Sequence, residues 1–65
     1  MKPESLGNGK CVKETAKAIR VELDDLGDKI WIPQSQVHEN SEVWKDGQEG
    51  EVIVSDWFAK KEGLI

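Results

Sequence analysis

Two short acidic turns, each containing glycine, divide the middle of this chain into strand-length segments. The first turn is Asp24-Asp25-Leu26-Gly27-Asp28, and the second is Lys45-Asp46-Gly47-Gln48-Glu49-Gly50. Tight turns favour these residue types, because glycine takes positive φ and aspartate side chains bond to nearby backbone. Segments between such turns are typical of strands. The pattern therefore predicts a small β-sheet domain, and it carries no catalytic signature.

Alternating side chains predict a hairpin around the first turn. Ile19, Val21 and Leu23 point one way along the preceding strand, and period two is the mark of a half-buried strand. Residues 29–32 predict its mate, which ends at Pro33 because proline lacks an N–H. The residues expected to be largely buried are Ile19, Val21, Leu23, Ile30, Ile32, Val52 and Val54.

The second half of the chain predicts shorter elements. Residues 34–40 predict a connection with a single helical turn, and residues 41–44 predict a short strand. Residues 51–54 predict a strand, and the β-branched run Val52-Ile53-Val54 within it is apolar on both faces, which predicts a position that is central or covered by another element.

A short C-terminal helix is predicted over residues 57–62. Either Ser55 or Asp56 is suited to its N-cap, and Gly63 is suited to the position after its end. A helix of this length is marginal alone, so it must dock on the sheet. The side chains available for docking are Trp57 or Phe58, together with Leu64.

The whole chain of 65 residues predicts one domain of the α+β class that is mostly β. We expect a small twisted antiparallel sheet, or an SH3-like partly open barrel, with one short C-terminal helix. Residues 14–65 form this domain in the prediction. Residues 1–13 contain Pro3 and three Gly or Asn residues without periodicity, which predicts a flexible N-terminal arm.

The net charge of −4 is distributed unevenly. Residues 1–20 carry five bases and two acids, whereas residues 21–56 carry ten acids and two bases. A general nucleic-acid-binding protein needs a basic surface, so the acidic centre favours a solvated face or one offered to a basic protein. The predicted partner-binding residues are Trp31 and the acidic residues Asp24, Asp25, Asp28, Asp46, Glu49 and Glu51.

The reactive residues indicate no catalytic or metal site. His38 and Glu42 lie four residues apart, but a zinc-protease helix needs a second histidine at the later position. We therefore expect a solvent-exposed His38. The aspartates of the first turn lack the spacing of a calcium loop, and turn chemistry explains them. The sequence predicts no enzyme activity, no cofactor and no metal.

Cys11 is the only cysteine, so no internal disulfide forms, and a reducing cytoplasm suits the chain better than secretion. It lies in the predicted arm without a base nearby in sequence, which argues against a nucleophile. No apolar run approaches the roughly 20 residues that a membrane span needs. Residues 1–10 lack the apolar segment of a signal peptide.

The three tryptophans, Trp31, Trp44 and Trp57, are spaced thirteen residues apart. One interpretation places them in the core or beneath the helix. The other places one or two at the surface as interface anchors, a role in which tryptophan is enriched. Trp31 is the leading anchor candidate, because it points away from Ile30 and Ile32 on the same strand.

A resemblance adds a prediction of origin. Residues 17–19, 30–37, 41–43 and 50–57, which include Trp31-Ile32-Pro33-Gln34-Ser35-Gln36, resemble a group of small uncharacterised proteins of phages and bacterial mobile elements. Those proteins often carry a Trp-Ile-Pro-x-Ser-Gln segment, and the resemblance implies provenance rather than an activity. The stretch 46–52 is similar to the glycine turn and strand of SH3-like barrels.

Two binding functions follow as predictions. The first is a non-enzymatic phage or mobile-element protein whose acidic surface blocks a basic nucleic-acid-binding host protein, as anti-CRISPR proteins and DNA mimics do. The alternative is a single-stranded nucleic-acid-binding module that uses exposed tryptophan for stacking and basic N-terminal residues for phosphates. A homodimer is compatible with either function. The phosphate-binding residues of the alternative are Lys10, Lys13, Lys17 and Arg20.

Overall fold

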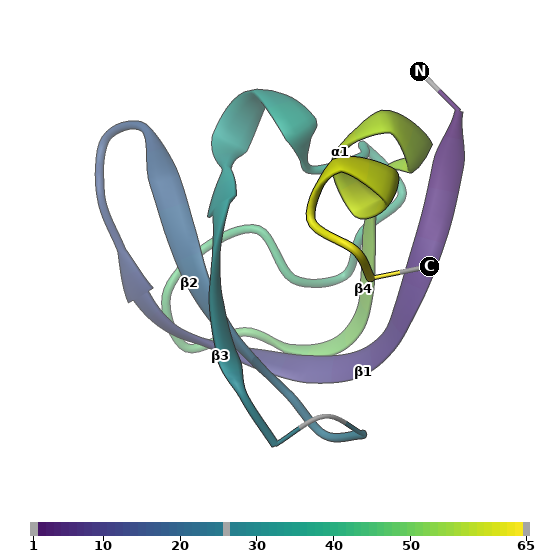
Figure 1. The fold of residues 1–65 in the computed structure, drawn as a ribbon. Helices are drawn as coiled ribbons and strands as arrows, with labels where there is room; N and C mark the ends of the chain where they lie inside the picture. The colour runs from purple at the N-terminus through teal and green to yellow at the C-terminus, as the bar shows by residue number, and fades with distance from the viewer. Residues whose placement is uncertain (1, 26, 65) are drawn as a thin grey trace.

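The computed structural model describes residues 2–25 and 27–64. Within them lie the strands β1 (Pro3–Glu14), β2 (Ala18–Leu23), β3 (Lys29–Pro33) and β4 (Glu49–Ser55), the 3-10 turn η1 (Gln34–Gln36) and the helix α1 (Asp56–Lys61). The strands form one antiparallel sheet in the order β3-β2-β1-β4. Figure 1 shows a strongly curved sheet in which β1 descends on the right of the view and crosses its lower middle, and α1 follows β4 at the upper right. The predicted class, mostly β with one short C-terminal helix, is confirmed.

The strand β1 overturns the prediction of a flexible N-terminal arm. Residues 3–14 form the longest strand, and it pairs with β2 on one side and β4 on the other. Its register shifts between Ser5 and Asn8 and again between Cys11 and Lys13. Such bulges bend a strand and increase its twist, so one strand can serve both halves of a curved sheet. They also interrupt the period-two pattern by which strands are recognised. Met1 lies outside the described residues.

The core occupies the inner face of the sheet. Six of the seven residues expected there are buried, whereas Ile30, on the edge strand β3, is half-buried. The alternation of β2 is therefore confirmed. The buried apolar residues of the core are Cys11, Ile19, Val21, Leu23, Ile32, Val43, Val52, Val54, Phe58 and Ala59.

Residues 41–44 do not form the predicted strand; they run irregularly along the outer edge of β4. The Glu42 N–H donates to the Glu51 carbonyl at 2.9 Å, and the Glu42 carboxylate accepts from the Glu51 N–H at 2.8 Å. The Ser41 hydroxyl accepts from the Ile53 N–H at 3.1 Å. These bonds cover the edge, so β4 is a covered strand rather than a central one.

The capping residues of α1 are those that its sequence predicts, although the helix begins and ends one residue earlier than expected. The Ser55 hydroxyl caps it by accepting from the Phe58 N–H at 3.1 Å, and Gly63 adopts a φ of 71° after its last turn. Phe58 is buried and Leu64 is half-buried against the core, whereas Trp57 is 58% exposed. Phe58, not Trp57, therefore docks the helix on the sheet.

Truncation of Ile32 should destabilise the fold more than truncation of Ile30. Ile32 is fully buried, so Ile32→Ala removes core contacts and leaves a cavity, at a cost of about 2–5 kcal/mol. Ile30→Ala should cost less, because part of that side chain already contacts solvent. Urea denaturation of the two variants measures the difference. Equal losses would contradict the partial exposure of Ile30.

Candidate functional site

Cross-strand pairing arranges the exposed charged side chains of the outer face in rows. Glu22 pairs with Lys29 on one side and with Lys10 on the other, and Lys10 in turn pairs with Glu49. All four side chains are exposed, and their charges alternate across the sheet. Opposite charges on directly facing residues stabilise a sheet, by about 0.2–1 kcal/mol per pair. Glu49 therefore lies beside a cation and is not part of a uniformly negative face.

A group of acidic residues gathers where the β2–β3 turn meets β1. The Asp24 N–H donates to the Asn8 carbonyl at 3.0 Å, and Asn8 pairs with Glu51 of β4. Asp24 and Glu51 therefore flank the same residue of β1. A Cβ atom added to Gly7 would lie 3.2 Å from Asp25 Oδ2, so this carboxylate also lies against β1. We call these residues, all exposed, the acidic end: Asp24, Asp25, Asp28 and Glu51.

Asp46, on the second acidic turn, lies away from the acidic end. Its N–H donates to Glu14 Oε1 at 3.3 Å, and the neighbouring Gly47 N–H donates to the Cys11 carbonyl at 3.0 Å. The second turn thus meets the last residues of β1, whereas the first turn meets the stretch around Asn8. In Figure 1 the β2–β3 turn extends at the bottom of the view, while the green segment before β4 lies at the left.

Trp31 belongs to another cross-strand row, whose other members are basic. It pairs with Arg20, which pairs with Lys13 on β1, and we call these three residues the aromatic–basic row. The guanidinium carbon of Arg20 lies 5.7 Å from the centroid of the Trp31 ring, within the range of a cation–π contact. Trp31 is 44% exposed. The row contains no acidic residue, and facing like charges such as those of Lys13 and Arg20 are unfavourable without an anion nearby.

The other two tryptophans also lie at the surface. Trp44 is 52% exposed with the Lys45 ammonium 5.2 Å from its ring centroid, and Trp57 has Lys61 at 4.9 Å. Lys45 directly follows Trp44, and Lys61 lies four residues after Trp57 on α1, so these contacts are local. All three tryptophans are therefore exposed, so the interpretation that places them in the core is wrong, and the role of interface anchor stays a prediction. The buried aromatic of the core is Phe58.

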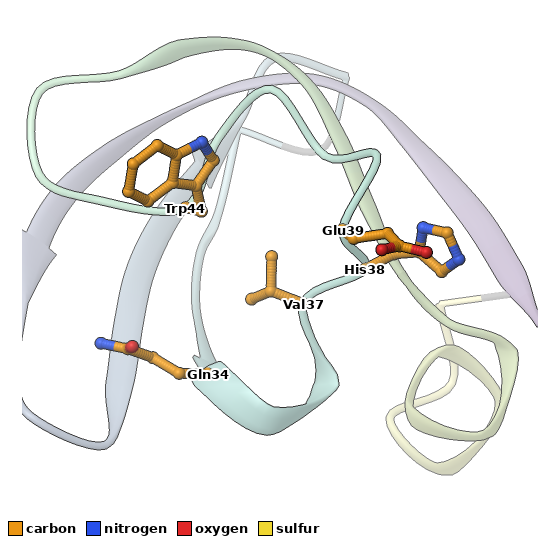
Figure 2. Close-up of a pocket in the computed structure, with 5 residues that line it drawn as sticks. All are labelled: Gln34, Val37, His38, Glu39 and Trp44. Carbon is orange, nitrogen blue, oxygen red and sulfur yellow. The ribbon is translucent and has the colours of Figure 1, made fainter. Parts of the chain in front are cut away.

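A shallow open depression of about 270 Å³ lies between η1 and the segment that precedes β4. Figure 2 shows Trp44 at one side of it, Val37 facing into it and Gln34 below. The remaining lining residues, His38 and Glu39, lie on the far side from Gln34. Among residues 2–25 and 27–64, no group of three or more His, Cys, Asp or Glu side chains is placed to hold a metal ion.

Two reactive residues are buried, against expectation. His38 is only 9% exposed, and its Nδ1 accepts from the Asn40 N–H at 3.1 Å, so the ring stabilises a turn. Cys11 lies in the core rather than in a flexible arm, with Sγ donating to the Lys13 carbonyl at 3.2 Å. Burial raises the pKa of the Cys11 thiol, and the hydrogen bond to Lys13 opposes that rise. The burial of His38 and of Cys11 was not predictable from the sequence, because it depends on strands that are distant in the chain.

No protein-family model, curated protein or solved structure matches the chain. The likeness of residues 31–36 to phage and mobile-element proteins thus stays a prediction. In the part of the chain that the structure describes, no helix combines the length and the apolar character needed to cross a membrane.

Proposed function

We propose that this chain is a non-enzymatic binding protein whose acidic end contacts a basic surface on a protein partner. The observation that carries the proposal is the convergence of the β2–β3 turn and Glu51 on either side of Asn8. Carboxylates that gather from separate segments create a local negative potential, which speeds encounter with a basic partner. An accessory protein of a phage or mobile element would act in this way by occupying the nucleic-acid-binding surface of a host protein.

The proposed contact includes fewer acidic residues than the sequence predicts. Asp46 lies at the other end of β1, and Glu49 faces Lys10 across the sheet. Neither therefore adds to the potential at the acidic end as strongly as Asp24 and Glu51 do. The Glu51 carboxylate also accepts from the Ser5 hydroxyl at 2.7 Å, which holds it on the outer side of β4.

The aromatic–basic row supports a second candidate, the binding of single-stranded nucleic acid. An exposed tryptophan ring can stack on a base while neighbouring cations contact phosphates. Trp31, Arg20 and Lys13 provide this combination in one row. Of the other predicted phosphate ligands, Lys10 lies between two glutamates, and Lys17 lies in the β1–β2 turn. Such binding would weaken steeply with added salt.

Reversal of the acidic turn tests the first candidate. The variant Asp24→Lys, Asp25→Lys, Asp28→Lys should lose capture of its partner from nuclease-treated host lysate, with affinity lowered at least about tenfold. Each change lies at the surface and should shift stability by less than about 0.5 kcal/mol. The matched control reverses three exposed carboxylates elsewhere and should bind like the unmodified chain: Glu39→Lys, Asp46→Lys, Glu62→Lys.

Further outcomes of these binding experiments separate the two candidate functions. Equal loss in both charge-reversal variants would point to a general charge effect and remove the acidic end from consideration. If nuclease abolishes capture, the ligand is nucleic acid, and Trp31→Ala should then abolish binding of a labelled single-stranded oligonucleotide. If the reversed variant still binds protein but a folded Trp31→Ala variant does not, the interface is aromatic and the acidic-end proposal fails.

A further inference from the structure

The strand β3 forms the free edge of the sheet, and its hydrogen bonding alternates along the chain. In an antiparallel pair, facing residues alternate between those that exchange hydrogen bonds and those that do not. Beyond the ends of the β2–β3 ladder, the Gln34 N–H donates to the Lys17 carbonyl and the Leu23 N–H donates to the Asp28 carbonyl. Combined with the register of the pair, these bonds identify the residues that bond toward β2 as Asp28, Ile30, Ile32 and Gln34.

The intervening residues direct their backbone groups outward. Lys29 and Trp31 each present an N–H and a carbonyl at the free edge, and Pro33 presents a carbonyl alone. Outside the ladder with β2, no hydrogen bond from the described part of the chain reaches the backbone of Lys29 or Trp31. The outer edge of β4 differs, because residues 41–42 cover it with hydrogen bonds.

Apolar side chains at this edge also lack full cover. Trp31 on the outer face is 44% exposed, and Ile30 on the inner face is only half-buried, although its neighbour Ile32 is fully buried. A further strand placed beside β3 would cover both side chains and would also pair the outward backbone groups. An exposed edge of this kind is a template for pairing with another strand.

We infer that β3 pairs antiparallel with β3 of a second copy of this chain, about a twofold axis at Trp31. This inference is independent of the proposed function. In this register Trp31 faces Trp31 of the second copy, and Lys29 faces Pro33 in both directions. The two facing tryptophans exchange N–H and carbonyl bonds, and each Lys29 N–H donates to a Pro33 carbonyl, which makes about four hydrogen bonds. The missing N–H of Pro33 leaves only the Lys29 carbonyls without a partner.

The register is self-complementary in its side chains as well. On the outer face the two Trp31 rings meet, and each Lys29 lies diagonal to the Trp31 ring of the other copy, within reach of a cation–π contact. On the inner face Ile30 lies opposite Ile32 of the second copy. No like charges face each other, because the two lysines lie at opposite ends of the paired strands.

Pairing of this kind closes at two copies. Each chain contributes the same edge, so the contact is isologous, and it leaves neither β3 free. The other sheet edge is covered in each copy by residues 41–42. A closed dimer therefore forms rather than a growing fibre.

Sedimentation equilibrium tests the inference. The paired strands are short, so the interface is smaller than about 1,200 Å² and the dimer is weak. A concentration series up to about 1 mM should show the mass rise from one copy to two. Trp31→Lys and Trp31→Glu should each stay monomeric, because like charges then face each other; an equimolar mixture should recover the dimer. Trp57→Lys changes another exposed tryptophan, on α1, and should dimerise like the unmodified chain.

Amide hydrogen exchange provides a second readout. Ile30 and Ile32 amides bond to β2 and should be protected at every concentration, whereas protection of the Lys29 and Trp31 amides should rise with concentration. A chain that stays monomeric to the end of the series, including one whose edge serves a different protein, would overturn the inference. So would two folded single variants whose mixture stays monomeric, or a dimer that Trp57→Lys dissociates as fully as Trp31→Lys does.

Discussion

A chain shortened to begin at Lys13 should fail to fold. The deletion removes most of β1, the strand that joins β2 to β4, together with the buried Cys11. Without β1, β4 loses its partner strand in the sheet and the β2–β3 hairpin loses its connection to β4. An isolated hairpin is marginally stable at best in water. A domain of this size is stabilised by only about 3–5 kcal/mol in total, so loss of a central strand exceeds the margin.

Amide dispersion in a two-dimensional NMR spectrum measures the result. The shortened chain should give the narrow dispersion of an unfolded polypeptide. A chain that begins at Glu4 is the matched control and should remain folded, because it loses only the outermost contacts of β1 with Ser55 and Asp56. A well-dispersed spectrum from the chain that begins at Lys13 would show that β1 is dispensable.

Gly9→Ala should be a strongly destabilising substitution. A Cβ atom at this position would lie 2.7 Å from the carbonyl oxygen of Glu22 and 3.1 Å from Val21 Cγ1. The first of these atoms belongs to the backbone of β2 and cannot move without disturbing its pairing with β1. Overpacking of a core costs about 1–3 kcal/mol, occasionally more, and here the backbone itself must shift. Most of the stability of the domain should therefore be lost.

Urea denaturation compares this variant with Gly47→Asn. Gly47 has a φ of 87° with no atom within 4 Å of an added Cβ, and asparagine tolerates this backbone conformation better than most residues. The control should lose about 1 kcal/mol or less. If the two variants lose the same stability, the close approach of Gly9 to β2 is not the cause.

The β2–β3 hairpin and α1 were predictable because their signals are local. The alternation of β2, the turn glycine at position 27 and the stop at Pro33 lie within one short stretch of chain. The same holds for the cap of α1, where Ser55 and the Phe58 N–H are three residues apart. Interactions between neighbours in sequence leave a pattern in the sequence, and these elements depend on little else.

The strand β1 was not predictable for the opposite reason. Its bulges break the alternation, and its glycine at position 9 resembles a marker of flexibility. That glycine is required by the backbone of Glu22, thirteen residues further along the chain. Residues 41–44 illustrate the same limit, because they bond to the edge of β4 without forming a strand.

The candidate site was likewise predictable from the sequence only in part. The sequence established which segments carry acid, that Trp31 points away from Ile30 and Ile32, and that a turn would present Asp24 and Asp25. Strand order alone decided their neighbours. Because β1 enters between β2 and β4, Lys10 lies between Glu22 and Glu49, and the basic N-terminal segment divides the acidic one. The acidic end formed only where pairing across β1 brought Glu51 to the β2–β3 turn, since charges distant in sequence become neighbours through strand pairing.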